Sequence, residues 1–132
     1  AECRSTHRIP LHCGAVRGHG DARRLVDERF AGMHAVHTNN NLCLIVFGLK
    51  LAEGDLMRGL SQTVAMGLDS DCTAASAGSI LGAVLGKSAI APELYECFHD
   101  RMDTYLKNTE AFSIRDMAKR YSALAHKVHS RL

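Results

Sequence analysis

The residues best suited to chemistry lie in one short segment, Gly67 to Cys72, which reads GLDSDC. Two carboxylates, Asp69 and Asp71, flank the Ser70 hydroxyl where one helical pattern ends and the next begins. The free amides of a helix N-terminus favour an acidic cap. A cap explains Asp71, but it does not explain why Asp69 and Ser70 stand beside it. Two carboxylates and a hydroxyl are also the oxygen ligands that Mg²⁺, Mn²⁺ or Ca²⁺ takes. The segment therefore predicts either a simple helix cap or a cation site.

Histidines and cysteines offer weaker candidates. His34 and His37 are three residues apart, as are His126 and His129. Each pair could share a helix face, but neither has a cysteine or carboxylate at a recognised zinc spacing. Ordinary core or surface histidines are the favoured interpretation. A further group of cysteines and histidines lies near the N-terminus. Its spacing is irregular and predicts no zinc site; its members are Cys3, His7, His12 and Cys13.

The segments that must position these residues have helical periodicity and almost no strand alternation. We expect an irregular segment over residues 1–20 and a helical region over residues 21–132. Asp21 is expected to cap the first helix. The apolar run from Leu42 to Leu51 could be a buried helix or a strand. A helix is favoured because Gly54 ends the run and Asp55 can cap the next helix.

Two further helices follow. Residues 73–86 carry Gly78, Gly82 and Gly86 four residues apart. Each interior glycine costs a helix about 1 kcal/mol relative to alanine, so we expect another backbone to approach this face closely. A last helix is expected to begin at Ser113, with Asp116 completing a variant capping box.

Bulk composition excludes several classes of protein. The 132 residues predict one domain or a piece of a larger one. Sixteen basic and fourteen acidic residues give a net charge of +2, which argues against nucleic acid or a membrane surface as a partner. Five cysteines without tight spacing argue against a disulfide scaffold and predict a reducing, cytoplasmic setting. We find neither a signal peptide nor an apolar run long enough to cross a bilayer.

The order of motifs resembles the ADP-ribosylglycohydrolase family. The chain carries HTNNN at residues 37–41, then EGD at 53–55, then GLDSDC and the AGSILGAVLG helix segment. The resemblance begins near residue 34 and runs to the end of the chain. It implies an all-α, orthogonally packed helical domain, of which this chain would be the C-terminal half. The implied activity is metal-dependent hydrolysis of an ADP-ribosyl glycosidic bond on a modified protein or small molecule.

The resemblance also assigns roles by position. Asp69 and Asp71 match two carboxylate ligands of a site that holds two Mg²⁺ or Mn²⁺ ions. Cys72 matches a third ligand position, where many members have Thr or Ser. The HTNNN element places His37, Asn40 and Asn41 near the substrate.

The chain departs from the family's pattern in two places. Cys72 offers sulfur, which is a poor ligand for a hard cation. The family's N-terminal acidic motif, with two adjacent Asp, does not occur in residues 1–33. Two hypotheses follow: a hydrolase that needs an N-terminal half, or a non-catalytic helical module that binds ligand or self-associates. A homo-oligomer or pairing with an N-terminal half is expected because a half-site would expose apolar surface.

Overall fold

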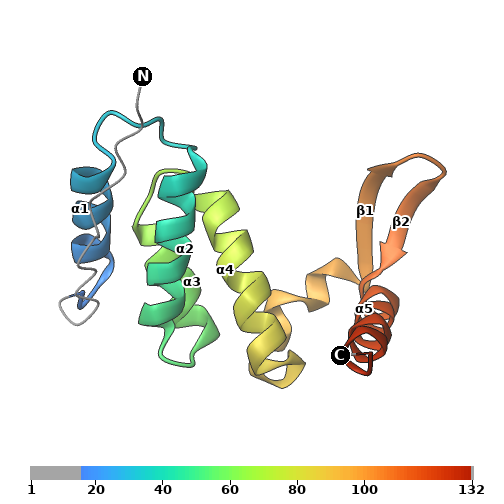
Figure 1. Cartoon of the computed structure of the whole chain (residues 1–132). Helices are drawn as coiled ribbons and strands as arrows, with labels where there is room; N and C mark the ends of the chain where they lie inside the picture. Colours follow the sequence, from blue (N-terminus) through green and yellow to red (C-terminus); the bar gives the residue numbers. More distant parts are fainter. Residues whose placement is uncertain (1–15, 132) are drawn as a thin grey trace. The chain divides into compact units, whose positions relative to one another are not determined.

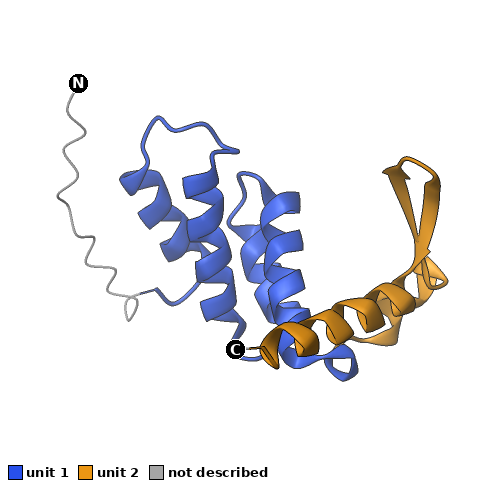
Figure 2. Ribbon diagram, turned by 45° about the vertical axis from the view of Figure 1, so that its right-hand side comes forward, with its two compact units in different colours: residues 1–89 blue, residues 90–132 orange. Residues whose placement is uncertain are grey.

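The computed structural model describes residues 16–131, and these fall into two compact units (Figure 2). Unit 1 covers Ala1–Ala89 and unit 2 covers Ile90–Leu132. Each unit is described by itself below. No helix among the described residues is long and apolar enough to cross a membrane.

Over its described residues, 16–89, unit 1 is a group of four α-helices, with α2 in contact with each of the other three (Figure 1). Helix α3 also packs against α4, and a 3₁₀ turn η1 (Lys87–Ala89) follows α4. The prediction of a helix over Leu42 to Leu51 is confirmed. The helices are α1 (His19–Arg29), α2 (Thr38–Ala52), α3 (Leu56–Ala65) and α4 (Ser70–Leu85).

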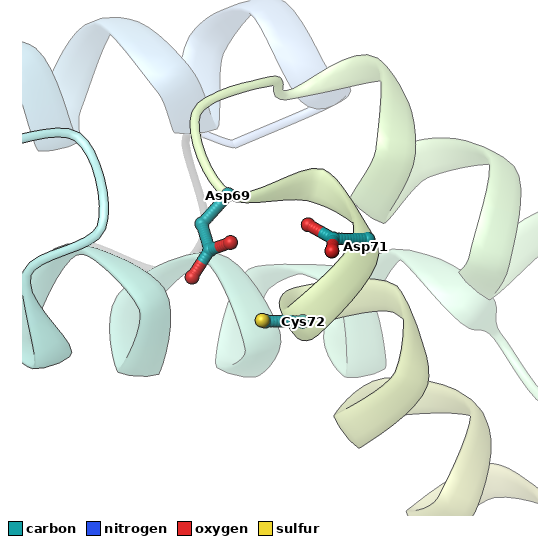
Figure 3. Close-up of side chains that lie close together, drawn as sticks. All are labelled: Asp69, Asp71 and Cys72. Carbon is teal, nitrogen blue, oxygen red and sulfur yellow. The ribbon is translucent and has the colours of Figure 1, made fainter.

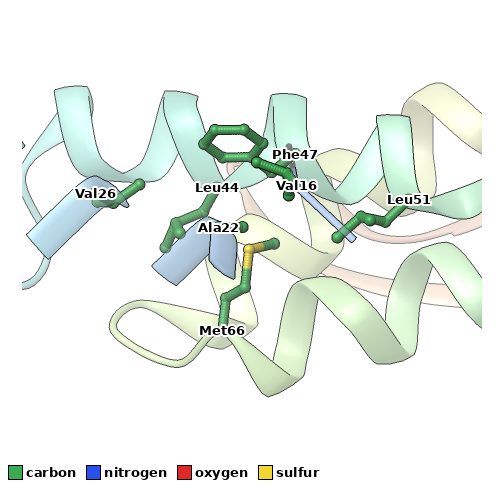
Figure 4. Close-up of a cluster of buried hydrophobic side chains, with 7 residues drawn as sticks. All are labelled: Val16, Ala22, Val26, Leu44, Phe47, Leu51 and Met66. Atoms are coloured by element: carbon green, nitrogen blue, oxygen red, sulfur yellow. The ribbon is translucent and has the colours of Figure 1, made fainter. Parts of the chain in front are cut away.

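The core of unit 1 lies between α1, α2 and the end of α3 (Figure 4). Leu44 and Phe47 from α2 face Ala22 and Val26 from α1, and Met66 follows α3. These side chains are almost fully buried, and burying one such apolar side chain stabilises a fold by roughly 1.5–3 kcal/mol. Val16 and Leu51 complete the cluster. This core fixes α2 and the segment after α3, which carry the candidate site residues.

Two glycines of α2 and α3 make the close approaches in unit 1. A Cβ on Gly48 would overlap the Thr63 side chain, and one on Gly59 would lie 2.5 Å from Leu81 and 2.8 Å from Ala52. The prediction that another backbone approaches the glycine face of α4 is wrong. A Cβ on Gly78 would lie 3.0 Å from the Leu60 side chain of α3, whereas one on Gly82 or Gly86 would meet nothing within 4 Å.

Unit 2 contains a hairpin that the sequence analysis missed. Strands β1 (Arg101–Leu106) and β2 (Thr109–Ser113) pair antiparallel, with Met102 opposite Phe112 and an irregularity between Asp103 and Leu106. Asn108 has φ +63° in the turn, a conformation that Asn tolerates better than most residues. The strands are short, β1 is exposed at all but one position, and β2 is mostly half-buried. Two 3₁₀ turns, η2 (Pro92–Leu94) and η3 (Glu96–Phe98), precede the hairpin.

Helix α5 (Ile114–His129) ends the described part of unit 2. Ser113 caps it as predicted, because its hydroxyl accepts the Asp116 N–H at 3.0 Å. The cap of α3 is also confirmed, with Asp55 accepting the Arg58 N–H at 2.6 Å.

The predicted cap of α1 is wrong. The helix begins at His19 with Gly18 at the N-cap. Asp21 lies in the first turn, where it accepts the Arg17 N–H at 3.1 Å. Glycine is also an accepted N-cap, so a short polar stretch offered more than one possible start. The N-terminal cysteine and histidine group lies outside the described residues.

The mostly helical architecture confirms the predicted fold class. Helices α1 to α4 and α5 carry most of the described residues, and the hairpin is a small addition.

Candidate metal centre

A tight turn after α3 brings the predicted metal ligands to the start of α4. Gly67 and Leu68 both have positive φ, at +73° and +62°. This conformation is strained for a leucine, and it is held by packing of Leu68 against the core. The Arg23 guanidinium of α1 donates to the Met66 carbonyl at 2.8 Å and closes the turn from the other side.

Asp69, Asp71 and Cys72 lie together at this helix start (Figure 3). One ligand atom from each lies within 4.8 Å of the other two. Among residues 16–131, this is the one group of three His, Cys, Asp or Glu side chains close enough to share an ion. Asp71 and Cys72 are exposed and Asp69 is half-buried, so the group is accessible to a ligand.

The simple cap does not account for this arrangement. Asp69 stands at the N-cap of α4, but its carboxylate accepts no capping hydrogen bond from the helix. Its backbone carbonyl accepts the Thr73 N–H, the first hydrogen bond within the helix, and also the Thr73 hydroxyl, each at 3.0 Å. Asp71 is the second residue of the helix, in its first turn. There the helix dipole stabilises the negative charge of Asp71, although the side chain does not cap the helix. Both carboxylates therefore keep oxygens that the helix does not use.

Asn41 of α2 holds the Asp69 carboxylate. Its side-chain N–H donates to Asp69 Oδ2, and this bond, followed by the Cys72 thiol, keeps the pKa of Asp69 below its ordinary value. The hydrogen bond to Asp69, together with the charges of Asp69 and Asp71, raises the pKa of the Cys72 thiol. Asp69 is thus ionised and the thiol protonated near neutral pH.

Two amide oxygens beside this group lack a partner. Asn40 is 3% exposed and donates to the His34 carbonyl at 2.9 Å, but its Oδ1 accepts no hydrogen bond among the described residues. Asn41 Oδ1 is likewise buried and unpaired there. Buried oxygens of this kind normally bind a protein group, a water or a ligand. The Asn41 oxygen belongs to the side chain whose N–H donates to Asp69.

The other predicted site residues are spread more widely. His37 is exposed at the N-cap of α2, where its Nδ1 accepts the Asn39 N–H at 3.2 Å. His34 accepts the Val36 N–H in the same way at 3.3 Å. Neither joins a cysteine or a carboxylate among the described residues, so these histidines form no zinc cluster.

Sequence reasoning missed Arg23. It lies 43 residues before Met66, and no local pattern links the two positions. Arg23 also forms an ion pair with Asp27 of the same helix at 2.8 Å. From the sequence, it is therefore indistinguishable from an ordinary surface ion pair.

The donor set fits a divalent cation in part. Two carboxylates suit a hard cation such as Mg²⁺, whereas a sulfur beside them does not. Asp69 and Asp71 are therefore the residues that would hold such an ion, and Cys72 is the departure.

Comparison with known proteins identifies the family. The family model described as ADP-ribosylglycohydrolase matches residues 8–130, almost the whole chain. No curated protein and no solved structure matches the chain. The family is all-α and typically metal-dependent, in agreement with the helical fold. The chain belongs to the ADP-ribosylglycohydrolase family.

Proposed function

We propose that this chain takes part in hydrolysis of the glycosidic bond between ADP-ribose and a modified acceptor. The observation that carries the proposal is the placement of Asp69 and Asp71 at the start of α4, with oxygens unused by the helix. Family membership supplies the reaction class, and the substrates it implies are ADP-ribosylated.

Asp69 and Asp71 are proposed as cation ligands. Asn41 donates a hydrogen bond to the Asp69 carboxylate and lowers its pKa, which favours the ionised form that a cation binds. When bound, a divalent cation orients hydroxyl groups of the substrate and polarises oxygen. We assign Asn40 and Asn41 to the substrate side of the site, because each has an amide oxygen without a hydrogen-bond partner among the described residues. His37 is proposed at the edge of the same region.

The ligand set in this chain is incomplete for a hard cation. Mg²⁺ requires six oxygen ligands in near-octahedral geometry, and two carboxylates leave four positions to fill. Water and substrate can supply some of them. We propose that an acidic segment of an N-terminal half supplies the rest, since residues 1–33 contain no pair of adjacent Asp.

A second candidate is a binding module without turnover. The Cys72 sulfur and the missing acidic motif favour it, because both weaken the cation site that hydrolysis would need. Such a module would bind ADP-ribose through the α2 and α4 residues but leave the glycosidic bond intact.

The deciding experiment measures release of free ADP-ribose from an ADP-ribosylated peptide. The full chain is assayed alone and with the N-terminal half of a family member, in EDTA and with added Mg²⁺, Mn²⁺ or Zn²⁺. Cation-dependent release that Asp69→Asn abolishes supports the hydrolase. Asp116→Asn, which removes an acid from the first turn of α5, is the matched control. Binding of ADP-ribose without release under every condition favours the second candidate.

A further inference from the structure

Unit 2 has apolar side chains but no core. None of its described residues is buried, and its one cysteine, Cys97, is exposed and free. A unit of about 40 residues rarely buries enough surface to be stable alone, and association with another surface is one way to compensate. The exposed apolar side chains of unit 2 are therefore candidates for an interface.

Helix α5 carries an apolar stripe bordered by positive charge. Tyr121, Leu124 and Val128 recur three and four residues apart, and each is more than half exposed. Arg120 stands four residues before Leu124 and Lys127 three residues after it, so both lie beside Leu124 on the helix surface. The helix holds four basic residues and one acid, which are Arg115, Lys119, Arg120, Lys127 and Asp116.

The segment that precedes α5 has the opposite charge. It also presents exposed apolar side chains, with Phe98 in η3 and Met102 and Leu106 in β1. Residues 90–113 contain five acids and two basic residues, Arg101 and Lys107. The acids are Glu93, Glu96, Asp100, Asp103 and Glu110.

These opposite charges do not pair within unit 2. Among the described residues, Arg120 and Lys127 form no ion pair. The same is true of Glu93, Glu96 and Glu110 in that part of the chain. Pairing of α5 with a second α5 is disfavoured because both helices carry excess positive charge. A second copy can instead present its acidic segment to α5, and a two-fold axis makes the contact reciprocal.

We propose that unit 2 is a self-association surface, in which α5 of one copy docks on residues 90–113 of a second copy. The reverse contact completes a two-fold dimer. The apolar side chains of both elements are then covered, and their unpaired charges face opposite charges around the contact. The dimer dissociates on dilution, so α5 is exposed in the monomer. This proposal does not depend on the cation site.

Charge reversal in the full chain tests which surfaces meet, with sedimentation equilibrium in a reducing buffer as the measurement. The basic-side variant is Arg120→Glu/Lys127→Glu, and the acid-side variant is Glu93→Lys/Glu96→Lys, all at exposed positions. Each variant should weaken self-association by roughly tenfold or more, because like charges then face each other in both contacts. Lys50→Glu, a charge reversal at an exposed position of unit 1, is the control and should leave association unchanged.

The two sets of substitutions are then brought together. A chain that carries both sets has opposite charges in both contacts again, and so does an equimolar mixture of the two variants. Both samples should therefore recover association. Pairing of α5 with a second α5 predicts no effect of the acid-side variant, whose substitutions lie outside that helix. The proposal is overturned by a wild type that stays monomeric at every concentration, by an acid-side variant that associates normally, or by failure of both combined samples to recover.

Discussion

Helices α4 and α5 have the same length, sixteen residues, and both begin beside acidic side chains, but they use those acids differently. At α5 the Ser113 hydroxyl caps the helix and Asp100 accepts hydrogen bonds from the Ser113 hydroxyl and the Arg115 N–H, each at 2.8 Å. At α4 the Asp69 carboxylate caps nothing, and its hydrogen-bonded partner comes from α2.

The difference separates structural acids from acids available to a ligand. Asp100 satisfies the first turn of α5 and ties it to the hairpin, so its oxygens are occupied. At the start of α4, by contrast, the helix amides do not use the carboxylates of Asp69 and Asp71, which lie close together. A count of acids near helix starts cannot distinguish these cases, whereas their hydrogen-bond partners can.

The two units also differ in burial. Unit 1 has a core in which Leu44 is 0% exposed. No described residue of unit 2 is buried, and α5 exposes Tyr121, Leu124 and Val128 on its apolar side. The expected homo-oligomer or pairing with an N-terminal half stays a prediction.

The largest expected effect tests this difference in burial. Leu44→Ala should destabilise unit 1 by about 2–5 kcal/mol, the usual result of emptying a packed core position. Leu124→Ala is the matched change in unit 2, where the leucine is 56% exposed. It should change stability by no more than about 0.5 kcal/mol. Urea unfolding of both variants, at a dilution where the chain is monomeric, provides the measurement, and a large loss for Leu124→Ala would reveal a partner that covers α5.

The next effect compares the acids of α4 and α5 directly. Asp71→Asn should weaken divalent-cation binding by at least roughly 10–100-fold, because a ligand is lost rather than an outer partner. Asp116→Asn removes the same charge from the first turn of α5 and should leave binding unchanged. Titration calorimetry with Zn²⁺ and Mn²⁺ measures both. Equal losses would mean that overall charge, not a site, attracts the ion.

The sequence predicted helices in unit 1, the last helix α5, and the caps of α3 and α5 for local reasons. Asp55 and Ser113 each precede an amphipathic stretch, and a capping side chain acts within three residues of its own position. The pairing of Asn41 with Asp69 followed from no local rule, since it spans 28 residues, and family resemblance alone placed both near one site.

The failures have the same origin in tertiary contacts. In α3 the buried residues are Leu56, Gly59 and Thr63, whereas Val64 is 50% exposed. Glycine at position 59 lets α3 approach Ala52 of α2 and Leu81 of α4 closely. Hydrophobicity along the chain carries no record of such an approach.

A smaller effect compares the caps. Ser113→Ala should destabilise α5 by about 0.5–2 kcal/mol, because the Asp116 N–H loses its acceptor. Asp69→Ala should leave α4 less affected, since the Asp69 carboxylate accepts no capping hydrogen bond that the substitution could remove. Amide hydrogen exchange in the first turn of each helix reports both changes. Faster exchange at the start of α4 than at α5 would show that Asp69 also serves as a cap.

The smallest effect concerns pH and the acid at the start of α5. The Arg115 N–H, then the Ser113 hydroxyl, lower the pKa of Asp100 from its ordinary value of 3.8, and the charges of Arg115 and Lys119 act in the same direction. A lowered pKa means that the ionised carboxylate stabilises the fold above 3.8 and that this contribution is lost as pH falls through the lower folded value. Amide exchange at Arg115 should therefore be slower in the wild type than in Asp100→Asn at neutral pH, and the two rates should converge in acid after correction for intrinsic exchange. Asp116→Asn serves as the control for loss of an acid in the same helix. A gap between wild type and Asp100→Asn that persists or widens in acid would contradict the structural role of Asp100, and with it the contrast between the two helix starts.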